Sequence, residues 1–324
     1  MFNGSLTNYW CSPELALEVI DKLAESGKHE IIGLIRKDPS SLPTFVGVKW
    51  VQTSYQDKSE LVEILRGVHT VISFIVAHTD PGAETSKRLI DASIESGVKR
   101  FAPSEWASGL KLADVIEFTP WYANKLVVSK YLQDINKDKK VIEYTLFQVG
   151  GFTNYLAFPH QTAKHYKIDY HTFIDLSKHR GIILEGSENT RVTFTTIQDI
   201  AEVTARAIEY EGEWPTIGGI NGQTLTLAEL IRLLEEIQGK PFEIDRLKLE
   251  DLKEGIFKTD FFPQIQIPGI SPEEAASFTK VVGIGMTVST GQGAWEVSDE
   301  WNKIFPDFKP TGIKEFLQKT LGSK

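Results

Sequence analysis

The stretch Ile94-Glu-Ser-Gly-Val-Lys-Arg-Phe-Ala-Pro-Ser-Glu-Trp-Ala107 decides the fold class of this chain. Its first four residues close an amphipathic helix, and Gly97 is a typical C-terminal stop. Residues 98–102 predict a short buried strand that Pro103 ends. Ligands of open α/β sheets bind beyond the carboxyl ends of parallel strands, so we expect Ser104 to lie where a ligand binds. The alternative is an ordinary polar loop without a function.

Helices and strands alternate on both sides of this stretch. Apolar residues at helical spacing, between capping and stop residues, predict helices over 13–26, 58–65, 81–96, 197–209, 226–238 and 313–321. Short apolar runs predict strands over 30–35, 48–52, 68–77, 98–102, 141–149 and 190–195. This order predicts an α/β fold, a Rossmann-like doubly wound parallel sheet with a smaller C-terminal substrate lobe. The segment 240–300 mixes short apolar runs with Gly and Pro, which is typical of such a lobe or of a lid.

The composition narrows the class of protein. The chain has 324 residues, of which 41% are hydrophobic and 24% are charged, as in a soluble globular protein. A net charge of −9 argues against a nucleic-acid partner, and we expect a small-molecule substrate instead. We find neither a signal sequence nor a run of 18 apolar residues, so we expect a cytoplasmic protein with no membrane partner. The sequence leaves the oligomeric state open.

Metal binding and disulfide formation are not expected. Cys11 is the single cysteine, so no disulfide can form within the chain. Four histidines fall in one window, but their spacing matches neither a helical pair of ligands nor a zinc finger. These are His160, His165, His171 and His179.

Two further sites carry residues suited to a nucleotide and to proton transfer. Arg36 and Lys37 follow the strand at 30–35, where an arginine fork suits the 2′-phosphate of NADP. Lys125 follows Trp121 and Tyr122 by four and three residues, spacings that share one face of a helix. A partly buried lysine at such a place can act as a general acid or base. The alternatives are a solvated strand end and a helix-surface lysine.

The segment Arg100-Phe-Ala-Pro-Ser-Glu-Trp106, followed by Lys125, resembles the isoflavone reductase-like, NmrA-like branch of the atypical short-chain dehydrogenases. The resemblance runs from about Pro13 to the C-terminus and is most specific at 94–106. It implies an NAD(P)-binding domain over 1–150, joined by about 190–209, and a mainly substrate-binding lobe over 151–324. It also implies an NADPH-dependent oxidoreductase acting on a small aromatic secondary metabolite. A non-catalytic NADP-sensing regulator and a member repurposed for non-redox chemistry are the alternatives.

The resemblance also assigns roles to single residues. Lys125 is the implied catalytic residue, with Tyr122 and Ser104 as auxiliary groups, while Trp121 stands where ordinary short-chain dehydrogenases have tyrosine. Phe152 and Tyr155 would shape the substrate pocket, and Asp199 would be structural at a helix start. The implied cofactor contacts are Arg36, Lys37, Phe74, Val76, Pro103, Ser104, Lys125, Gln148, Gly150 and Phe152.

The glycine-rich phosphate loop of a dinucleotide fold is missing from its expected place. Residues 6–12, before the helix that begins at Pro13, contain no glycine, and residues 1–5 are too short and polar for a central strand. Either the first strand has been lost from a family-like sequence, or this member has abandoned ordinary cofactor binding. We favour the first interpretation, because the following helix keeps the register of the family. We expect residues 1–12 to be irregular.

Overall fold

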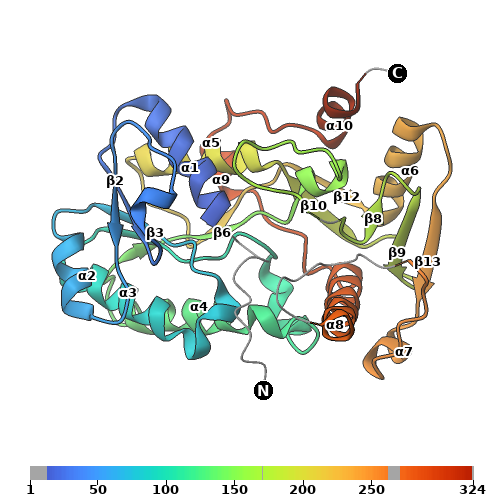
Figure 1. The fold of residues 1–324 in the computed structure, drawn as a ribbon, viewed down its shortest axis with the longest axis horizontal. Helices are drawn as coiled ribbons and strands as arrows, with labels where there is room; N and C mark the ends of the chain where they lie inside the picture. The colour runs from blue at the N-terminus through green and yellow to red at the C-terminus, as the bar shows by residue number, and fades with distance from the viewer. Residues whose placement is uncertain (1–12, 170, 262–270, 323–324) are drawn as a thin grey trace.

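The computed structural model describes residues 13–169, 171–261 and 271–322 (Figure 1). The helices are α1 (Pro13–Ser26), α2 (Lys58–Leu65), α3 (Glu84–Glu95), α4 (Ala123–Ile135), α5 (Ile197–Glu209), α6 (Leu227–Gln238), α7 (Leu249–Lys253), α8 (Pro272–Gly291), α9 (Glu300–Ile304) and α10 (Ile313–Leu321). The strands are β1 (Ile31–Ile35), β2 (Val48–Gln52), β3 (Thr70–Ile72), β4 (Arg100–Ala102), β5 (Glu143–Tyr144), β6 (Leu146–Gln148), β7 (Gly151–Phe152), β8 (Ile174–Asp175), β9 (Arg180–Leu184), β10 (Arg191–Thr195), β11 (Ile217–Gly219), β12 (Gln223–Thr226) and β13 (Glu243–Leu247).

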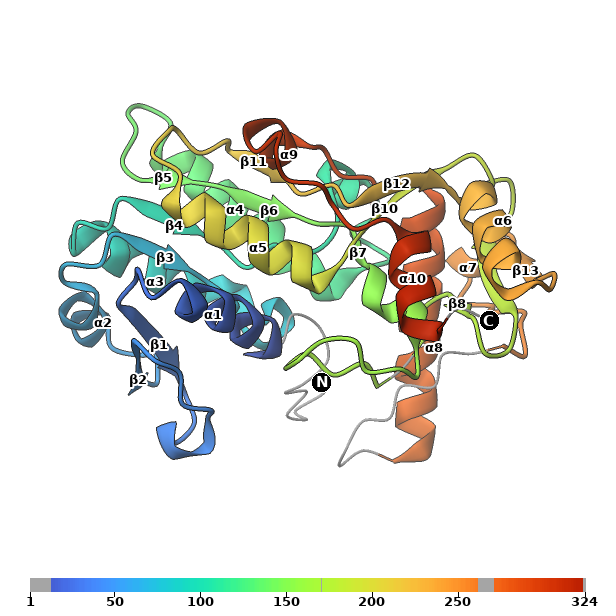
Figure 2. The ribbon, with the colours of Figure 1, turned by 90° about the horizontal axis from the view of Figure 1, so that it is seen from above.

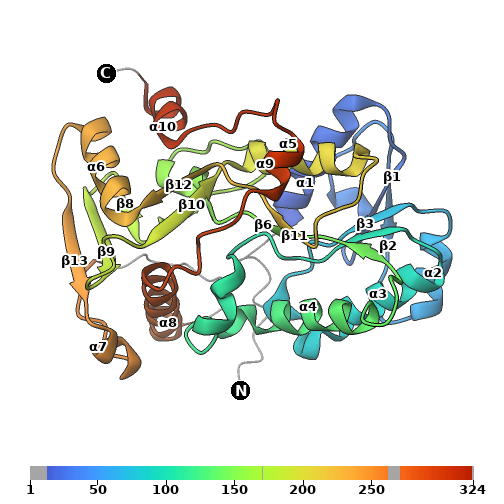
Figure 3. The same ribbon diagram turned by 180° about the vertical axis from the view of Figure 1, so that it is seen from behind.

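The predicted α/β fold with parallel strands is confirmed. β1 runs parallel to β2, β3 and β5 run parallel to β4, and β6 runs parallel to β11. Helices α1 and α5 lie on one side of these strands, and α3 and α4 lie on the other (Figures 1 and 3). Val19 and Leu23 of α1 pack against Ala201 of α5, which joins the N-terminal helix to a helix from the second half of the chain.

The parallel strands β1 to β6 and β11 form three separate hydrogen-bonded groups within the described part of the chain. β1 and β2 pair with each other, β3, β4 and β5 form a second group, and β6 and β11 form a third. Tyr55 connects the first two groups, because its hydroxyl donates to Leu34 O at 2.8 Å while its ring lies in the core with Val71. The expected irregular segment 1–12 and the missing phosphate loop lie outside the described residues.

Several expected strands are shorter than the sequence suggests. The strand expected over 68–77 ends at Ile72, and a 3-10 turn follows at Ala77–Thr79. The strand expected over 141–149 divides into β5 and β6 because the chain changes its partner there. The Thr145 N–H donates to Phe101 O, and the next N–H, of Leu146, donates to Thr216 O.

The second half of the chain is more regular than expected. β10 pairs with β7 and β12 and not with the main parallel strands. The segment 240–300, expected to be part of a substrate lobe or a lid, contains α8, a helix of 20 residues, and β13, which pairs with β9. Gly285 on α8 lets the helix approach its neighbour, since a Cβ there would lie 2.2 Å from Phe118 O and 2.5 Å from the Trp121 ring. Small residues on several faces of α8 conceal its helical periodicity.

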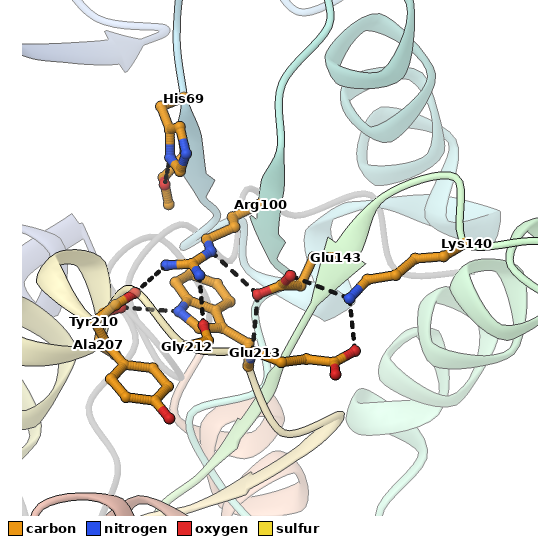
Figure 4. A network of polar contacts seen from close by, with 10 residues as sticks. His69, Arg100, Lys140, Glu143, Ala207, Tyr210, Gly212 and Glu213 are labelled. Atoms are coloured by element: carbon orange, nitrogen blue, oxygen red, sulfur yellow. Dashed lines mark hydrogen bonds and ion pairs between the residues drawn. The ribbon is translucent and has the colours of Figure 1, made fainter.

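Arg100 fastens the connection after α5 to the start of β4 (Figure 4). Its guanidinium donates to the carbonyls of Tyr210 and Gly212, and its Nε lies 3.1 Å from Glu143 Oε1. The same Glu143 oxygen accepts from the Trp214 N–H at 2.9 Å, and the guanidinium lies 5.1 Å from the Trp214 ring centroid. Arg100 is only 8% exposed, so its hydrogen bonds are shielded from water. The arginine of the resemblance motif is therefore structural.

Replacing Arg100 should destabilise the fold. We expect Arg100→Met to lower the free energy of unfolding by about 3 kcal/mol, because two carbonyls and a mostly buried carboxylate lose their partner. Urea denaturation followed by circular dichroism measures the change. Lys140→Met is the matched control, because Lys140 bonds to the other oxygen of Glu143 but is exposed, and it should cost less than about 1 kcal/mol. Equal losses for the two variants would contradict the structural role of Arg100.

Candidate active site

An apolar pocket opens where β4, β6 and β7 end. Tyr122, Gly150 and Phe152 belong to its lining, as do residues from the second half of the chain. The lining is dominated by aromatic side chains, which are Trp106, Tyr122, Phe152, Tyr155, Tyr166, Phe173, Phe194 and Trp295. Such a wall suits a flat, uncharged ligand, because rings can stack or meet edge to face and none of the described lining side chains carries a formal charge.

Lys125 lies buried behind the Tyr122 wall of the pocket. Its ammonium donates to Ser104 O at 2.9 Å and to Glu105 O, and it lies 5.2 Å from the centroid of the Tyr122 ring. The lysine is 4% exposed and is not part of the pocket lining itself. The predicted closeness of Lys125, Tyr122 and Ser104 is thus observed. Tyr122 precedes α4, in a 3-10 turn at Pro120–Tyr122, rather than on the same helix.

Trp106 fixes the turn after β4. Its indole N–H donates to Ser73 O at 3.0 Å, and its ring stacks on Phe74 and Phe147 with centroids 4.8 and 4.9 Å apart. Its backbone has φ of 38°, a left-handed conformation that needs support from its surroundings. Phe74, an expected cofactor contact, therefore packs on Trp106.

Buried polar atoms without a partner identify the part of the site that suits a polar ligand. Ser104 Oγ and Gln148 Oε1, at the ends of β4 and β6, are shielded from solvent and have no hydrogen-bond partner among the described residues. A buried polar atom left unpaired costs about 1–3 kcal/mol, so a ligand that supplies partners gains this energy. The ribose hydroxyls and carboxamide of a nicotinamide nucleotide could supply them. The neighbouring Pro103 and Val76 are buried and apolar.

Arg36 and Lys37 lie apart from the pocket, after β1. Both side chains are exposed, and no carboxylate of the described residues pairs with the Arg36 guanidinium, which lies 5.3 Å from the Tyr55 ring centroid. An exposed, unpaired guanidinium beside an aromatic ring fits a phosphate and an adenine. The described residues therefore fit NADP at its two ends, while the expected loop for the pyrophosphate falls outside them.

Gly150 has a structural reason to be glycine. It has φ of 69°, and a Cβ at this position would lie 2.3 Å from Thr193 O. The close approach belongs to the pairing of β7 with β10, where Gly151 faces Phe194. Gly150 lines the pocket through its backbone, so a direct cofactor role for it remains a prediction.

Several pocket residues could not be recognised from the sequence. They come from loops, β10 and the end of α8, and in sequence they look like ordinary core residues. They are Tyr166, Thr172, Phe173, Val192, Phe194, Met286 and Trp295. Asp199, by contrast, is structural as expected, since its carboxylate accepts from the Thr311 N–H at 2.8 Å.

The described residues contain no helix that is both long and apolar enough to cross a membrane. They also contain no group of three or more His, Cys, Asp or Glu side chains that could hold a metal ion. The histidines of the 160–179 window have other contacts in this part of the chain. His165 lies 3.4 Å from Asp21 Oδ2, and the ring of His171 stacks on Phe261 with centroids 4.9 Å apart.

Comparisons with solved structures confirm the Rossmann-like fold. An isoflavone reductase superposes with a TM-score of 0.66 at 18% identity, covering 95% of this chain and 96% of the other. The NADPH-dependent quinone oxidoreductase QOR2 of Escherichia coli, solved with NADPH, superposes with a TM-score of 0.63 at 20% identity, with coverages of 95% and 96%.

Sequence comparison then defines the family. The profile of the NmrA-like family matches residues 14–317, so this chain belongs to the NmrA-like family. The oxidoreductase swnN of Metarhizium robertsii is 22% identical, over 93% of this chain and 92% of its own length. The phenylcoumaran benzylic ether reductase PT1 of Pinus taeda is 25% identical, over 84% of this chain and 80% of its own.

Glu105 should make the stability of the protein depend on pH. Burial raises the pKa of its carboxyl from 4.5 to about 7, although the nearby Lys125 charge opposes the shift. Below about pH 4.5 the carboxyl is protonated in both the folded and the unfolded state, so its burial does not lower the free energy of unfolding through ionisation. As the pH rises from there to about 7, only the unfolded chain gains from ionisation, so the folded state loses up to about 3 kcal/mol.

We therefore expect Glu105→Gln to flatten this loss of stability. The free energy of unfolding, measured by urea denaturation between pH 5 and 8, should fall with pH in the wild type and much less in the variant. Glu63→Gln, on the exposed side of α2, should keep the wild-type dependence. A Glu105→Gln profile parallel to that of the wild type would show that the carboxyl ionises normally in the folded protein.

Proposed function

We propose that this protein is an NADPH-dependent reductase of a small aromatic compound. The observation that carries the proposal is the buried Lys125 ammonium beside a pocket walled by aromatic side chains. Two observations support a dinucleotide running from β1 to the pocket: polar atoms at the strand ends, and the Arg36 guanidinium over the Tyr55 ring, have no polar partner among the described residues. The names of relatives and structural neighbours, which include NADPH-dependent reductases, agree with this assignment.

In such a reduction the residues of this chain would have separate roles. NADPH, when bound, would supply the hydride from its nicotinamide ring. The aromatic walls would hold the substrate ring by stacking and exclude water from it. Lys125 would hold the proton for the substrate next to Ser104, and the Tyr122 ring would shield its ammonium from water. The two carbonyls that Lys125 contacts would keep its ammonium in place throughout.

A second candidate function is a regulator that binds NADP without turning it over. Its support is the engagement of Lys125, because the ammonium of a 4% exposed lysine is bonded to two main-chain carbonyls and serves the turn after β4. Isothermal titration with NADPH, together with absorbance assays of NADPH consumption with quinones and hydroxylated aromatic compounds, separates the two. Consumption with any of these supports the reductase, whereas tight binding with no consumption supports the regulator.

Arg36 should decide between the two nicotinamide cofactors. Arg36→Ala should weaken NADPH binding by about 1.5–3 kcal/mol, the value of a hydrogen bond to a charged group, and leave NADH binding nearly unchanged. Titration calorimetry with both cofactors measures this. Arg66→Ala removes an exposed arginine that pairs with Glu63, three residues earlier, and should change neither affinity. An equal loss for both cofactors would mean that Arg36 serves the fold.

Lys125 should matter more for turnover than Tyr122. We expect Lys125→Met to lower kcat by about 10²–10⁴-fold, as for a positioned acid–base group, and Tyr122→Phe to lower it much less. Lys130→Met, on the exposed side of the same helix, is the control and should retain activity. The reverse order of effects would make the Tyr122 phenol the proton donor. Full activity in both variants, with folding verified by circular dichroism, would remove both from the mechanism.

A further inference from the structure

One wall of the pocket belongs to the loop between the 3-10 turn at Thr153–Ala157 and β8. Tyr166, on this loop, is 5% exposed and lies edge to face with Phe152 at a centroid distance of 5.5 Å. Its hydroxyl lies 2.8 Å from the hydroxyl of Tyr155, which forms the adjacent wall. The position of this loop therefore sets the width of the pocket at the two tyrosines.

Helix α1 holds this loop at Tyr166, the loop residue that lines the pocket. Glu18 Oε1 accepts from the main-chain N–H of His165 at 2.6 Å and from that of Tyr166 at 2.9 Å. Glu18 is 9% exposed, and hydrogen bonds to a buried carboxylate are stronger than those between neutral groups. In Figure 2 the green loop lies beside the N-terminal end of α1.

Neighbouring contacts strengthen the same junction. Asp21 lies one helical turn beyond Glu18 on the same face of α1, and its carboxylate pairs with Lys164 at 2.6 Å. The base of the loop is closed by Gln161, whose side-chain amide donates to Ile168 O at 2.7 Å and accepts from the Ile168 N–H at 3.0 Å. Gln161 and Ile168 thus bond to each other across the loop, while α1 holds Tyr166, the pocket residue, through its main chain.

We propose that Glu18 is a positioning residue for the pocket, which fixes the Tyr166 wall through the main chain of the loop. The proposal rests on the proposed function only in taking this pocket as the substrate site. Glu18 itself is not part of the pocket lining, so it acts through Tyr166 and not by touching a ligand. A helix of the expected cofactor-binding half thereby shapes the pocket for the substrate.

The test measures ligand binding and loop order in Glu18 variants of the full chain. Naphthol is the probe, and its binding is followed by fluorescence, because Trp106 and Trp295 line the pocket. Glu18→Met, which removes both acceptor bonds, should weaken naphthol binding by about tenfold and speed amide hydrogen exchange at 165 and 166 by about a hundredfold. Glu18→Gln keeps an acceptor oxygen, so it should retain most of the naphthol affinity and most of the protection of these two amides from exchange.

Matched controls separate positioning from general stability. Glu25→Met makes the same change at the exposed end of α1 and should leave both readouts at the wild-type level. If Glu18→Met does not fold, the shorter Glu18→Asp should show the same two effects in smaller measure. On an active substrate, the variants should raise KM with little change in kcat.

The outcomes for this inference and for the proposed function are distinct. Naphthol affinity and amide exchange that do not depend on Glu18, in folded variants, overturn the positioning role, as does a wild type that does not bind naphthol. If naphthol affinity and amide exchange depend on Glu18 but the protein consumes no NADPH, the positioning role is supported and the proposed reductase function is rejected.

Discussion

The site depends on the interactions of the Trp106 indole. It reaches from the turn after β4 to the end of β3, where it donates to Ser73 O, and it stacks between Phe74 and Phe147. Strand ends that belong to different hydrogen-bonded groups are thus joined by side chains. The stacking continues from Phe147 to Trp301 with centroids 5.7 Å apart, which extends the packed column away from the pocket. Together with the main-chain bond from the Trp106 N–H to Phe147 O, this column holds the turn whose carbonyls accept from Lys125.

Lys125 and Glu105 show how burial shapes the chemistry of this turn. The protein places an ammonium and a carboxyl in its interior within reach of each other's charge, and the described residues give the carboxyl no hydrogen bond. A charge in such a place is costly, so a proton can be held there near neutral pH. Groups of this kind occur often at functional sites, although structural networks such as that of Arg100 also bury charges.

Local signals in the sequence were enough to predict most of the helices and the alternating order of helices and strands in the first half of the chain. Pro13, the N-cap residue Thr226 and the stop residue Gly239 set helix ends as expected, because caps act within a few residues. Strand ends were less predictable, because Thr145 and Leu146 change partners through contacts with distant segments. Helix α8 was missed because tertiary packing, and not an amphipathic pattern, holds it.

The site was predictable only in part, for a similar reason. The motif around Ser104 and Lys125 indicated one wall, and the structure brings these residues together as expected. Other lining residues, such as Tyr166, Phe194 and Trp295, are spaced in sequence in a way that does not indicate their meeting in space. The contact of Glu18 with the loop spans 147 residues in sequence and leaves no local sign.

The close packing at Gly285 has a consequence for how this protein can change over time. A Cβ at this position would lie 2.2 Å from Phe118 O and 2.5 Å from the Trp121 ring, in the chain segment that leads into the helix of Lys125. A single added methyl group there would have to displace that segment, and with it the turn that carries Tyr122. A substitution at Gly285, which does not line the pocket, would therefore alter the pocket through Tyr122. Keeping glycine at this position preserves the geometry of the pocket during evolution.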